Sequence, residues 1–465
     1  METKIKINHR QMAWMVTVIL TAGGFLTTPK TLVALSKADA WLTQIAGMVY
    51  ALFIAALLYY LARRFPGKSL FEITFELLGK WGGGLCNFLF LLHIFTILIR
   101  DMGVFSDFMN TTLLIRTPGE IIVLLMILLV VYFASSSVEV AVRVNDLIFP
   151  LFLGMLLAVP LLLGNEFDLR RIEPIFGQGY HPVLGGNLIA WGWYDEILIV
   201  GAFMGMLGSS KKLYAALRHG VMSTALLMTM VLFFTVAVLG IEVAARLMYP
   251  NYSLVEQIHI TDYLDRIELF MFSVWLPIFL LKIAFKFLAI LHIFSAFAGR
   301  MNLSLYGKQA GWLLLLLWSF AFKSVTEVFN FANYGTVLIS APDILICLLL
   351  YLAGRRRKVV DEEGVAADDR PQPQKKQKGG IWQWAIQQPE RRWQRITNYA
   401  ATSAVLIFLL AAYFGQFSPA AGAIGGGGIL LALIIGYTSS YLEMRQANYA
   451  SVRRQQKAKQ RRRAG

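Results

Sequence analysis

Two apolar segments of the chain are interrupted by glycines and polar residues, and such interruptions are where a membrane-embedded protein can bind a small ligand. The first carries TAGGFLTTP at residues 21–29, and the second carries WGWYDE at residues 191–196. Broken helices leave backbone groups without intrahelical partners. Half-helix N-termini then attract carboxylates, while freed carbonyls and acidic side chains attract ammonium groups. The pattern predicts binding of a small zwitterion.

Seven residues at the two interruptions are the predicted ligand contacts. The glycines of the first allow close approach to the backbone, and the acid of the second can pair with an ammonium group. A kinked helix whose glycines pack against a neighbour explains the first interruption equally well when it is taken alone. The second, in the matching span, favours a binding site that comprises Thr21, Gly23, Gly24, Trp191, Gly192, Tyr194 and Glu196. A bulky residue at position 24 is expected to abolish ligand response without preventing insertion.

Further ionisable residues lie within apolar segments, where an unpaired charge costs at least a few kcal/mol. Lys282 can replace a bound cation or carry a proton, whereas Lys286, one turn away, is expected to extend toward the cytoplasmic interface. Arg100 is expected to form a structural ion pair with acids of its own helix. The acids considered as structural or coupling charges are Asp101, Asp107 and Asp195.

The composition indicates that this chain lies in a lipid bilayer. Hydrophobic residues make up 57% of its 465 residues, and the mean hydropathy is +0.59, more than one water-soluble core needs. A helix crosses about 30 Å of hydrocarbon in roughly 17–25 apolar residues. The chain is therefore expected to be an all-α, polytopic membrane protein, with spans near 11–34, 41–62, 85–112, 120–134, 141–163, 187–208, 217–245, 268–298, 309–328, 331–353, 397–414 and 423–441.

The first ten predicted spans divide into two halves of five, and each half begins with a glycine-broken segment. An odd number of spans makes the second half enter the membrane from the opposite side, so that the two breaks meet near the middle of the bilayer. This predicts a five-plus-five inverted-repeat transporter fold with discontinuous first and sixth helices. The last two spans, around four glycines at 425–428, add a C-terminal two-helix extension.

Composition also predicts four regions. Residues 1–354 form the ten-span core, and residues 355–395 form a charged cytoplasmic linker that ends in a tryptophan-rich interfacial segment. Residues 396–442 form the transmembrane hairpin, and residues 443–465 form a basic tail. The distribution of Lys and Arg between the loops places both termini in the cytoplasm.

Charge and motif content exclude several function classes. The formal net charge is +15, with the excess after residue 354, and a basic tail beside a membrane span favours anionic lipid over nucleic acid. The two cysteines and six histidines are scattered. No phosphate-binding or hydrolase motif occurs at a usable position. We therefore expect no metal site, no cofactor and no enzymatic activity.

Several stretches together resemble a known family. They are the glycine-to-proline break at 24–29, TPGE at 117–120 with Tyr132, VEVAVRVND at 138–146, WYDE at 193–196 and RIELFMFSVW at 266–275. On these stretches, residues 10 to about 354 resemble the B-subunit family of bacterial spore nutrient-germinant receptors. That family is the spore germination permease branch of the amino acid–polyamine–organocation transporter superfamily.

The resemblance implies the inverted-repeat fold, a small-ligand pocket between the first, third, sixth and eighth spans, and a germinant sensor in the inner membrane of the spore. It also implies two partners, a channel-forming A subunit and a lipoprotein C subunit. Glu139 and Arg143 match an acid and an arginine of the family and are candidate structural charges. The chain departs from the family in its additional residues 355–465 and in TAGG at 21–24, where Gly-x-Gly is commoner.

Two functions of different kinds are compatible with these residues. The first is a sensor that binds a small nutrient, most simply an amino acid, and passes its occupied state to partner subunits by a shift of the broken helices. The alternative is an amino acid or amine symporter driven by protons or sodium, in which Glu196 or Lys282 handles the coupling ion. Fold does not separate them, because function depends on the site. A structural scaffold would explain the extension but not the two breaks.

Overall fold

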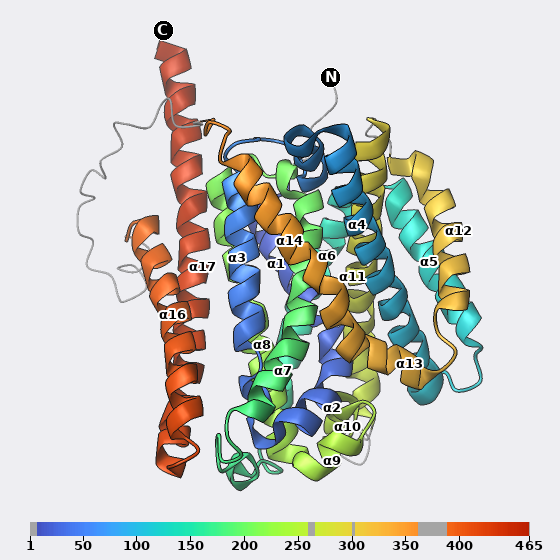
Figure 1. Cartoon of the computed structure of the whole chain (residues 1–465), viewed down its shortest axis with the longest axis vertical. Coiled ribbons are helices and arrows are strands. Elements are labelled where there is room, and N and C mark those ends of the chain that lie inside the picture. Colours follow the sequence, from blue (N-terminus) through green and yellow to red (C-terminus); the bar gives the residue numbers. More distant parts are fainter. Residues whose placement is uncertain (1–6, 259–265, 300–302, 361–387, 465) are drawn as a thin grey trace.

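The computed structural model describes residues 7–258, 266–299, 303–360 and 388–464, and for residues 303–305 and 448–464 it describes the backbone alone. Every regular element within these residues is a helix (Figure 1), which confirms the all-α fold class. Most of the predicted linker, residues 361–387, lies outside the described residues, as do the first two of its three tryptophans.

The first half of the core opens with a helix broken in two. α1 (His9–Thr21) and the segment that begins with α2 (Gly24–Ser36) are bent by 46° relative to each other. This confirms the predicted discontinuity of the first span. The half continues with η1 (Lys37–Leu42), α3 (Ile45–Ala62), α4 (Leu70–Phe108), the π-helical η2 (Met109–Leu113), α5 (Gly119–Ser135) and α6 (Val138–Leu162).

The second half opens with a helix that changes type. After the short η3 (Leu169–Ile172), α7 (His181–Tyr194) runs directly into the 3-10 helix η4 (Asp195–Ala202), so the sixth span is also discontinuous. The other elements are η5 (Met204–Met206), α8 (Ser210–Leu239), α9 (Ile241–Arg246), α10 (Pro250–Glu256), α11 (Ile267–Ala298), α12 (Leu303–Ala321), α13 (Val325–Asn330), the π-helical η6 (Phe331–Gly335) and α14 (Thr336–Gly354).

Glycines with a positive φ set two span boundaries. Within α4, a short helical segment begins at Leu70, after the capping box of Ser69 and Glu72, and ends at a kink at Gly79 (φ 71°), so the long apolar part of the third span begins close to the predicted position. The seventh span ends at Leu239 rather than near 245, because Gly240 adopts a φ of 76°. A positive φ does not continue a right-handed helix, and glycine adopts it without steric cost.

By length and apolar composition alone, eight of the described helices can cross a membrane, and the bent pair α1–α2 makes a ninth. The prediction of twelve spans additionally counts α5, the α7–η4 pair and α12. Of these three, α5 is shorter, the α7–η4 pair changes helix type, and α12 begins with a more polar stretch. The core of the fold is set by pairs of helices: α1 packs on α8, α2 on α7, α4 on α11, and α5 on α12 at one edge of the molecule (Figure 1). The packing of α2 on α7 brings the two broken spans together.

The C-terminal extension is a pair of antiparallel helices at the opposite edge of the molecule from α5 and α12. α16 (Glu390–Phe414) and α17 (Pro419–Ala464) pack on each other, and α17 also packs on α8 (Figure 1). α17 continues unbroken through the basic segment, and its end lies at the same end of the molecule as the N-terminus. The lipid contact expected of the tail concerns side chains beyond residue 447, which lie outside the description.

Buried polar contacts join this extension to the core. Arg218 of α8 forms an ion pair with Glu443 of α17 at 3.3 Å, and both side chains are only 2% exposed. The Arg218 guanidinium also donates to the Gln394 carbonyl of α16 at 3.2 Å. The neighbouring ring nitrogen His219 Nδ1 lies 3.1 Å from the Ser440 hydroxyl. Two polar residues of the core therefore find their partners in the extension.

Replacing Glu443 with alanine is expected to lower the free energy of unfolding by about 3–5 kcal/mol, because it leaves the Arg218 charge buried without its partner. Denaturant unfolding of the purified protein in detergent measures this loss. The matched control is Glu242→Ala, which removes one member of an exposed ion pair with Arg246 and should change stability little. Similar losses in both variants would contradict a structural role for the buried pair.

Candidate functional site

Side chains of other helices satisfy the backbone groups freed at the first break. Pro29 has no N–H, so the Phe25 carbonyl lacks its usual partner four residues on. Asn251 Nδ2 donates to this carbonyl at 2.5 Å, and Trp275 Nε1 donates to the Ala22 carbonyl at 3.1 Å. α10 and α11 therefore hold the broken span in its bent form.

Replacing Asn251 with leucine is expected to lower the free energy of unfolding by about 1–3 kcal/mol, because the buried Phe25 carbonyl loses its donor. Asn251 also accepts a hydrogen bond from Thr235 Oγ1 at 2.8 Å, but this hydroxyl has a second acceptor in the Val231 carbonyl at 2.7 Å. Thr235→Val is therefore the control and should cost less. Equal losses in denaturant unfolding would refute the role of Asn251 at the break.

The hydroxyls predicted at the first break bond to their own helix. Thr21 Oγ1 donates to the Thr17 carbonyl at 2.6 Å, and Thr27 and Thr28 donate to the carbonyls of Gly23 and Gly24. All three threonines are buried. The ligand contact proposed for Thr21 stays a prediction, and it requires this hydroxyl to exchange one acceptor for another.

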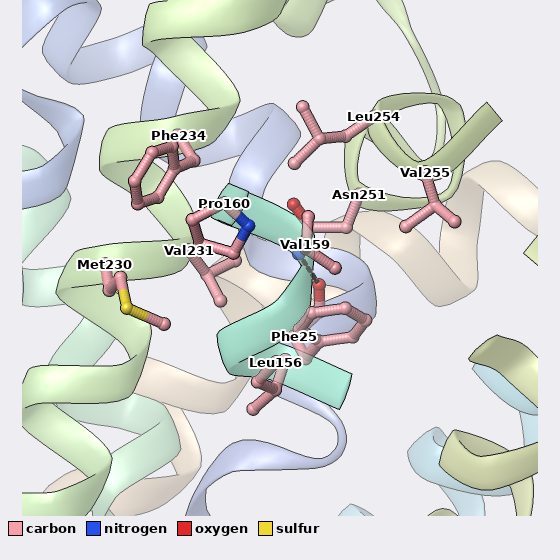
Figure 2. Close-up of a pocket in the computed structure, with 10 residues that line it drawn as sticks. All are labelled: Phe25, Leu156, Val159, Pro160, Met230, Val231, Phe234, Asn251, Leu254 and Val255. Carbon is pink, nitrogen blue, oxygen red and sulfur yellow. Dashed lines mark hydrogen bonds between the residues drawn. The ribbon is translucent and has the colours of Figure 1, made fainter. Parts of the chain in front are cut away.

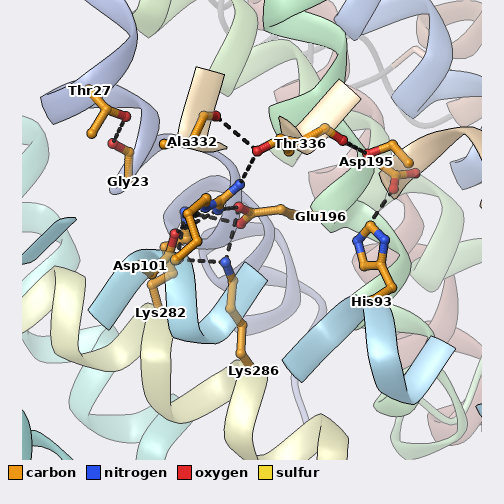
Figure 3. A network of polar contacts seen from close by, with 12 residues as sticks. Gly23, Thr27, His93, Asp101, Asp195, Glu196, Lys282, Lys286, Ala332 and Thr336 are labelled. Carbon is orange, nitrogen blue, oxygen red and sulfur yellow. Dashed lines mark hydrogen bonds and ion pairs between the residues drawn. The ribbon is translucent and has the colours of Figure 1, made fainter. Parts of the chain in front are cut away.

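Five charged side chains meet where α4, η4 and α11 pack together (Figure 3), and we call Arg100, Asp101, Glu196, Lys282 and Lys286 the charged cluster. Arg100 Nη2 lies 2.6 Å from Asp101 Oδ1 and also pairs with Glu196. Lys282 Nζ lies 3.0 Å from Glu196 Oε2 and 3.3 Å from Asp101 Oδ2. Lys286 Nζ lies 2.6 Å from Asp101 Oδ2 and 3.0 Å from Glu196 Oε1. All five side chains are buried.

Lys286 corrects an expectation from the sequence. It was expected to extend to the interface, yet its ammonium is fully buried between two carboxylates. The prediction is wrong because α4 places Asp101 and η4 places Glu196 beside Lys286, and only the packing of these elements shows it. The two ion pairs offset part of the cost of removing the ammonium from water.

Trp193 connects the charged cluster to the first break. The Arg100 guanidinium lies 3.8 Å from the centre of its ring, and Lys282 Nζ lies 4.8 Å from it, both within range of a cation–π interaction. A Cβ at Gly23 would collide with both Lys282 Nζ and the Trp193 ring, whereas a Cβ at Gly24 would meet its nearest atom at 3.7 Å. The absence of a side chain at position 23 therefore leaves room for the Lys282 ammonium beside the first break.

A second buried group adjoins the cluster, because Asp195 precedes Glu196 in the chain. We call His93, Asp195 and Asp343 the histidine–aspartate group. His93 Nε2 lies 3.5 Å from Asp195 Oδ2, and Nδ1 lies 2.9 Å from Asp343 Oδ2 (Figure 3). The Tyr50 hydroxyl donates to Asp195. The group brings α3, α4, η4 and α14 together and is rich in acids, whereas the charged cluster has one more cation than anion.

The other residues predicted for the site lie around these groups or apart from them. Trp191 stacks edge-on against Tyr50, and Tyr194 donates to Gln44 Oε1 at 3.3 Å. A Cβ at Gly192 would press on the backbone of α14 at 3.1 Å. Three candidate charges stand outside the charged cluster: Asp107 is further along α4, and Glu139 and Arg143 form an exposed pair with each other on α6.

An apolar pocket lies beside the first break, between α2, α6, α8 and α10 (Figure 2). It has about 300 Å³ of empty space, including the part open to the outside, and Phe25 and Asn251 contribute to its wall. None of the seven predicted ligand contacts lines it. Its remaining lining residues are Leu156, Val159, Pro160, Met230, Val231, Phe234, Leu254 and Val255.

Sequence reasoning missed His93 and Asp343 as members of a site. Asp343 could have been found by the same argument that singled out Glu196, since an acid within an apolar span is a functional candidate. His93 carries no comparable signal, because it is 250 residues from Asp343 and about 100 from Asp195. The six histidines are scattered along the sequence, but the fold brings His93 into contact with two acids.

Comparisons with known proteins agree with this architecture. A profile of the family described as spore germination protein matches residues 6–306. The chain is 23% identical to the putative spore germination protein YfkT of Bacillus subtilis over 71% of this chain and 91% of that protein. It is 23% identical to spore germination protein B2 of the same organism over 75% of this chain and 94% of that protein, and 20% identical to spore germination protein A2 over 77% and 98%.

A solved structure shows the same fold. The structure of Mhp1, a nucleobase-cation-symport-1 family transporter in a closed conformation with bromovinylhydantoin bound, superimposes with a TM-score of 0.56 at 13% identity, covering 96% of this chain and 97% of that one. At this identity the likeness establishes the transporter fold alone. With more than half of its length matched by the family profile, the chain belongs to the family of spore germination proteins, as the sequence resemblance indicated.

Proposed function

We propose that this chain is a membrane-embedded sensor for a small nutrient, most simply an amino acid, in a germinant receptor. The observation that carries the proposal is the opposite excess charge of two adjoining buried groups at the second break. The charged cluster has three cations for two anions, and the histidine–aspartate group has two acids for one imidazole. A zwitterion has the complementary pair of charges.

The carboxylate of the ligand is proposed to pair with Lys282 beside the first break, and its ammonium with the acids that follow the second. The predicted contacts are Thr21, Gly23, Gly24, Trp191, Gly192, Tyr194 and Glu196. Glu196 already faces three cations in the structure, so in this proposal it positions Lys282 and leaves the ammonium to Asp195. Because the site is buried away from water, opposite charges attract each other more strongly there than in solvent.

Binding is proposed to shift the broken helices against α4 and α11 and so to signal to partner subunits of the A and lipoprotein C kinds. The chain would work in the inner membrane of the spore with both termini in the cytoplasm. Family membership and the positions of both ends at one end of the molecule support this arrangement. Co-purification of the tagged chain with the products of neighbouring genes tests the partners.

The ligand proposal is tested by equilibrium binding of a panel of radiolabelled amino acids to proteoliposomes that contain the purified chain. For the panel member that binds, the matched amino acid amide, which lacks the carboxylate, should compete at least about tenfold more weakly, a loss of about 1.4 kcal/mol. The amine without a carboxyl group should behave like the amide. Equal competition by acid and amide would overturn the assignment of Lys282.

A coupled symporter is the second candidate, because the fold is shared with a symport-family transporter. It would use the same site and differ in moving the ligand across the membrane. Binding alone does not separate the two, whereas accumulation inside sealed proteoliposomes does.

A further inference from the structure

We propose that the histidine–aspartate group is a binding site for one proton, held between His93 Nε2 and Asp195 Oδ2. The site shares Asp195 with the proposed ammonium contact, but the proposal goes beyond the sensor function and does not depend on it. It rests on the geometry of the imidazole and on the charges of the groups buried around it.

The contacts of the imidazole fix one of its hydrogens. Nδ1 lies 3.2 Å from the Ile339 carbonyl oxygen, which can only accept, so Nδ1 carries a hydrogen in either charge state of the ring. Nε2 faces Asp195 Oδ2 at 3.5 Å. In a neutral ring with its hydrogen on Nδ1, Nε2 would direct a lone pair at a carboxylate. A proton on Nε2 replaces this repulsion with an ion pair.

The charges of the neighbouring groups require one added proton, and the contacts of the ring place it at His93. The charged cluster contributes three cations and two anions, and Asp195 and Asp343 add two anions. With His93 protonated, the eight groups comprise four cations and four anions. Among the described residues no further charged side chain forms an ion pair with any of them. An uncompensated charge in the middle of a membrane protein is costly, and the proton removes it.

The surroundings of the group favour a proton over a metal ion. Each ring nitrogen of His93 has a different nearest carboxylate, although one ligand atom from each of the three side chains lies within 4.8 Å of the other two. A metal ion takes the lone pair of one nitrogen and draws its other ligands to that same side. The other titratable groups that face the site are neutral ones, the Tyr50 hydroxyl of α3 and the buried Cys347 thiol of α14.

Nitrogen-15 NMR of the full-length chain in lipid, with imidazole-labelled histidine, tests the proposal. At about pH 8 a histidine with an ordinary pKa is neutral, so a doubly protonated ring at this pH is diagnostic. His93, assigned by its absence in His93→Gln, should have both ring nitrogens protonated at this pH. A neutral His93 at this pH would overturn the proposal.

Two variants extend the test. Asp195→Asn and Asp343→Asn each remove one carboxylate and should leave His93 neutral at the same pH. Asp146→Asn, at a half-buried position beside Arg10, should leave the His93 signal unchanged. A His93 signal that stays doubly protonated in both asparagine variants would contradict the bridge. One equivalent of zinc bound with a change in the His93 signal would show a metal site in place of the proton site.

Discussion

Replacing Asp101 with asparagine is expected to lower the free energy of unfolding by about 3–5 kcal/mol. Asp101 lies within 3.3 Å of an atom of each of three buried cations, Arg100, Lys282 and Lys286. The amide cannot neutralise them, so three cations would share Glu196 alone. Denaturant unfolding of the purified protein in detergent measures the loss.

Two further variants separate this charge effect from a general disturbance of α4. Asp107→Asn changes the same residue type on the same helix at a position with no ion pair among the described residues, and it should cost much less. Adding Lys286→Met to Asp101→Asn leaves two cations and one anion, which restores the single excess cation of the wild-type cluster. It should recover part of the lost stability as a coupling energy. A double variant no more stable than Asp101→Asn would count against the cluster as a unit.

Replacing Gly23 with alanine is expected to weaken ligand binding at least tenfold, about 1.4 kcal/mol or more. The new Cβ takes the space of the Lys282 ammonium and the Trp193 ring, so the lysine must withdraw from the first break. Overpacking of this kind typically costs about 1–3 kcal/mol. Binding of the radiolabelled panel to proteoliposomes measures the change, and germination of spores that carry the variant gives the response.

Gly24→Ala is the matched control one residue away. Its Cβ would lie 3.7 Å from Met228 Cε and from Thr28 Cγ2, an ordinary packing distance. Binding should therefore stay within about twofold of the wild-type value, less than 0.6 kcal/mol. The sequence placed the sensitive glycine at position 24, and the structure makes position 23 the tighter one for a small substitution. If the two alanine variants bind alike, the lysine does not define the pocket.

Features encoded locally could be predicted from the sequence. Both broken spans were recognised from the glycines and Pro29, and the family from short stretches around them. The short segment of α4 between Leu70 and the kink at Gly79 was not predicted as a helix, although Ser69 and Glu72 form a capping box ahead of it, because the hydropathy of residues 72–80 is low. Hydropathy marks where a helix is apolar, and not where it begins.

Features that depend on packing between distant segments could not be predicted. The position of Lys286 along its own helix predicts an ammonium that reaches the interface. Its actual position depends on Asp101 and Glu196, which come from other parts of the chain. His93 and Asp343 meet only because α4 and α14 pack together. A buried charge in a membrane core pairs with the opposite charge that helix packing places beside it. A single sequence does not show which helices are neighbours.

The most direct test of the sensor function compares binding with accumulation in sealed proteoliposomes, with and without a proton gradient, for the amino acid that binds. The sensor function predicts saturable binding that equals the amount of protein and no further uptake when the gradient is applied. Gradient-driven accumulation beyond the number of binding sites would contradict it and would make this chain a symporter.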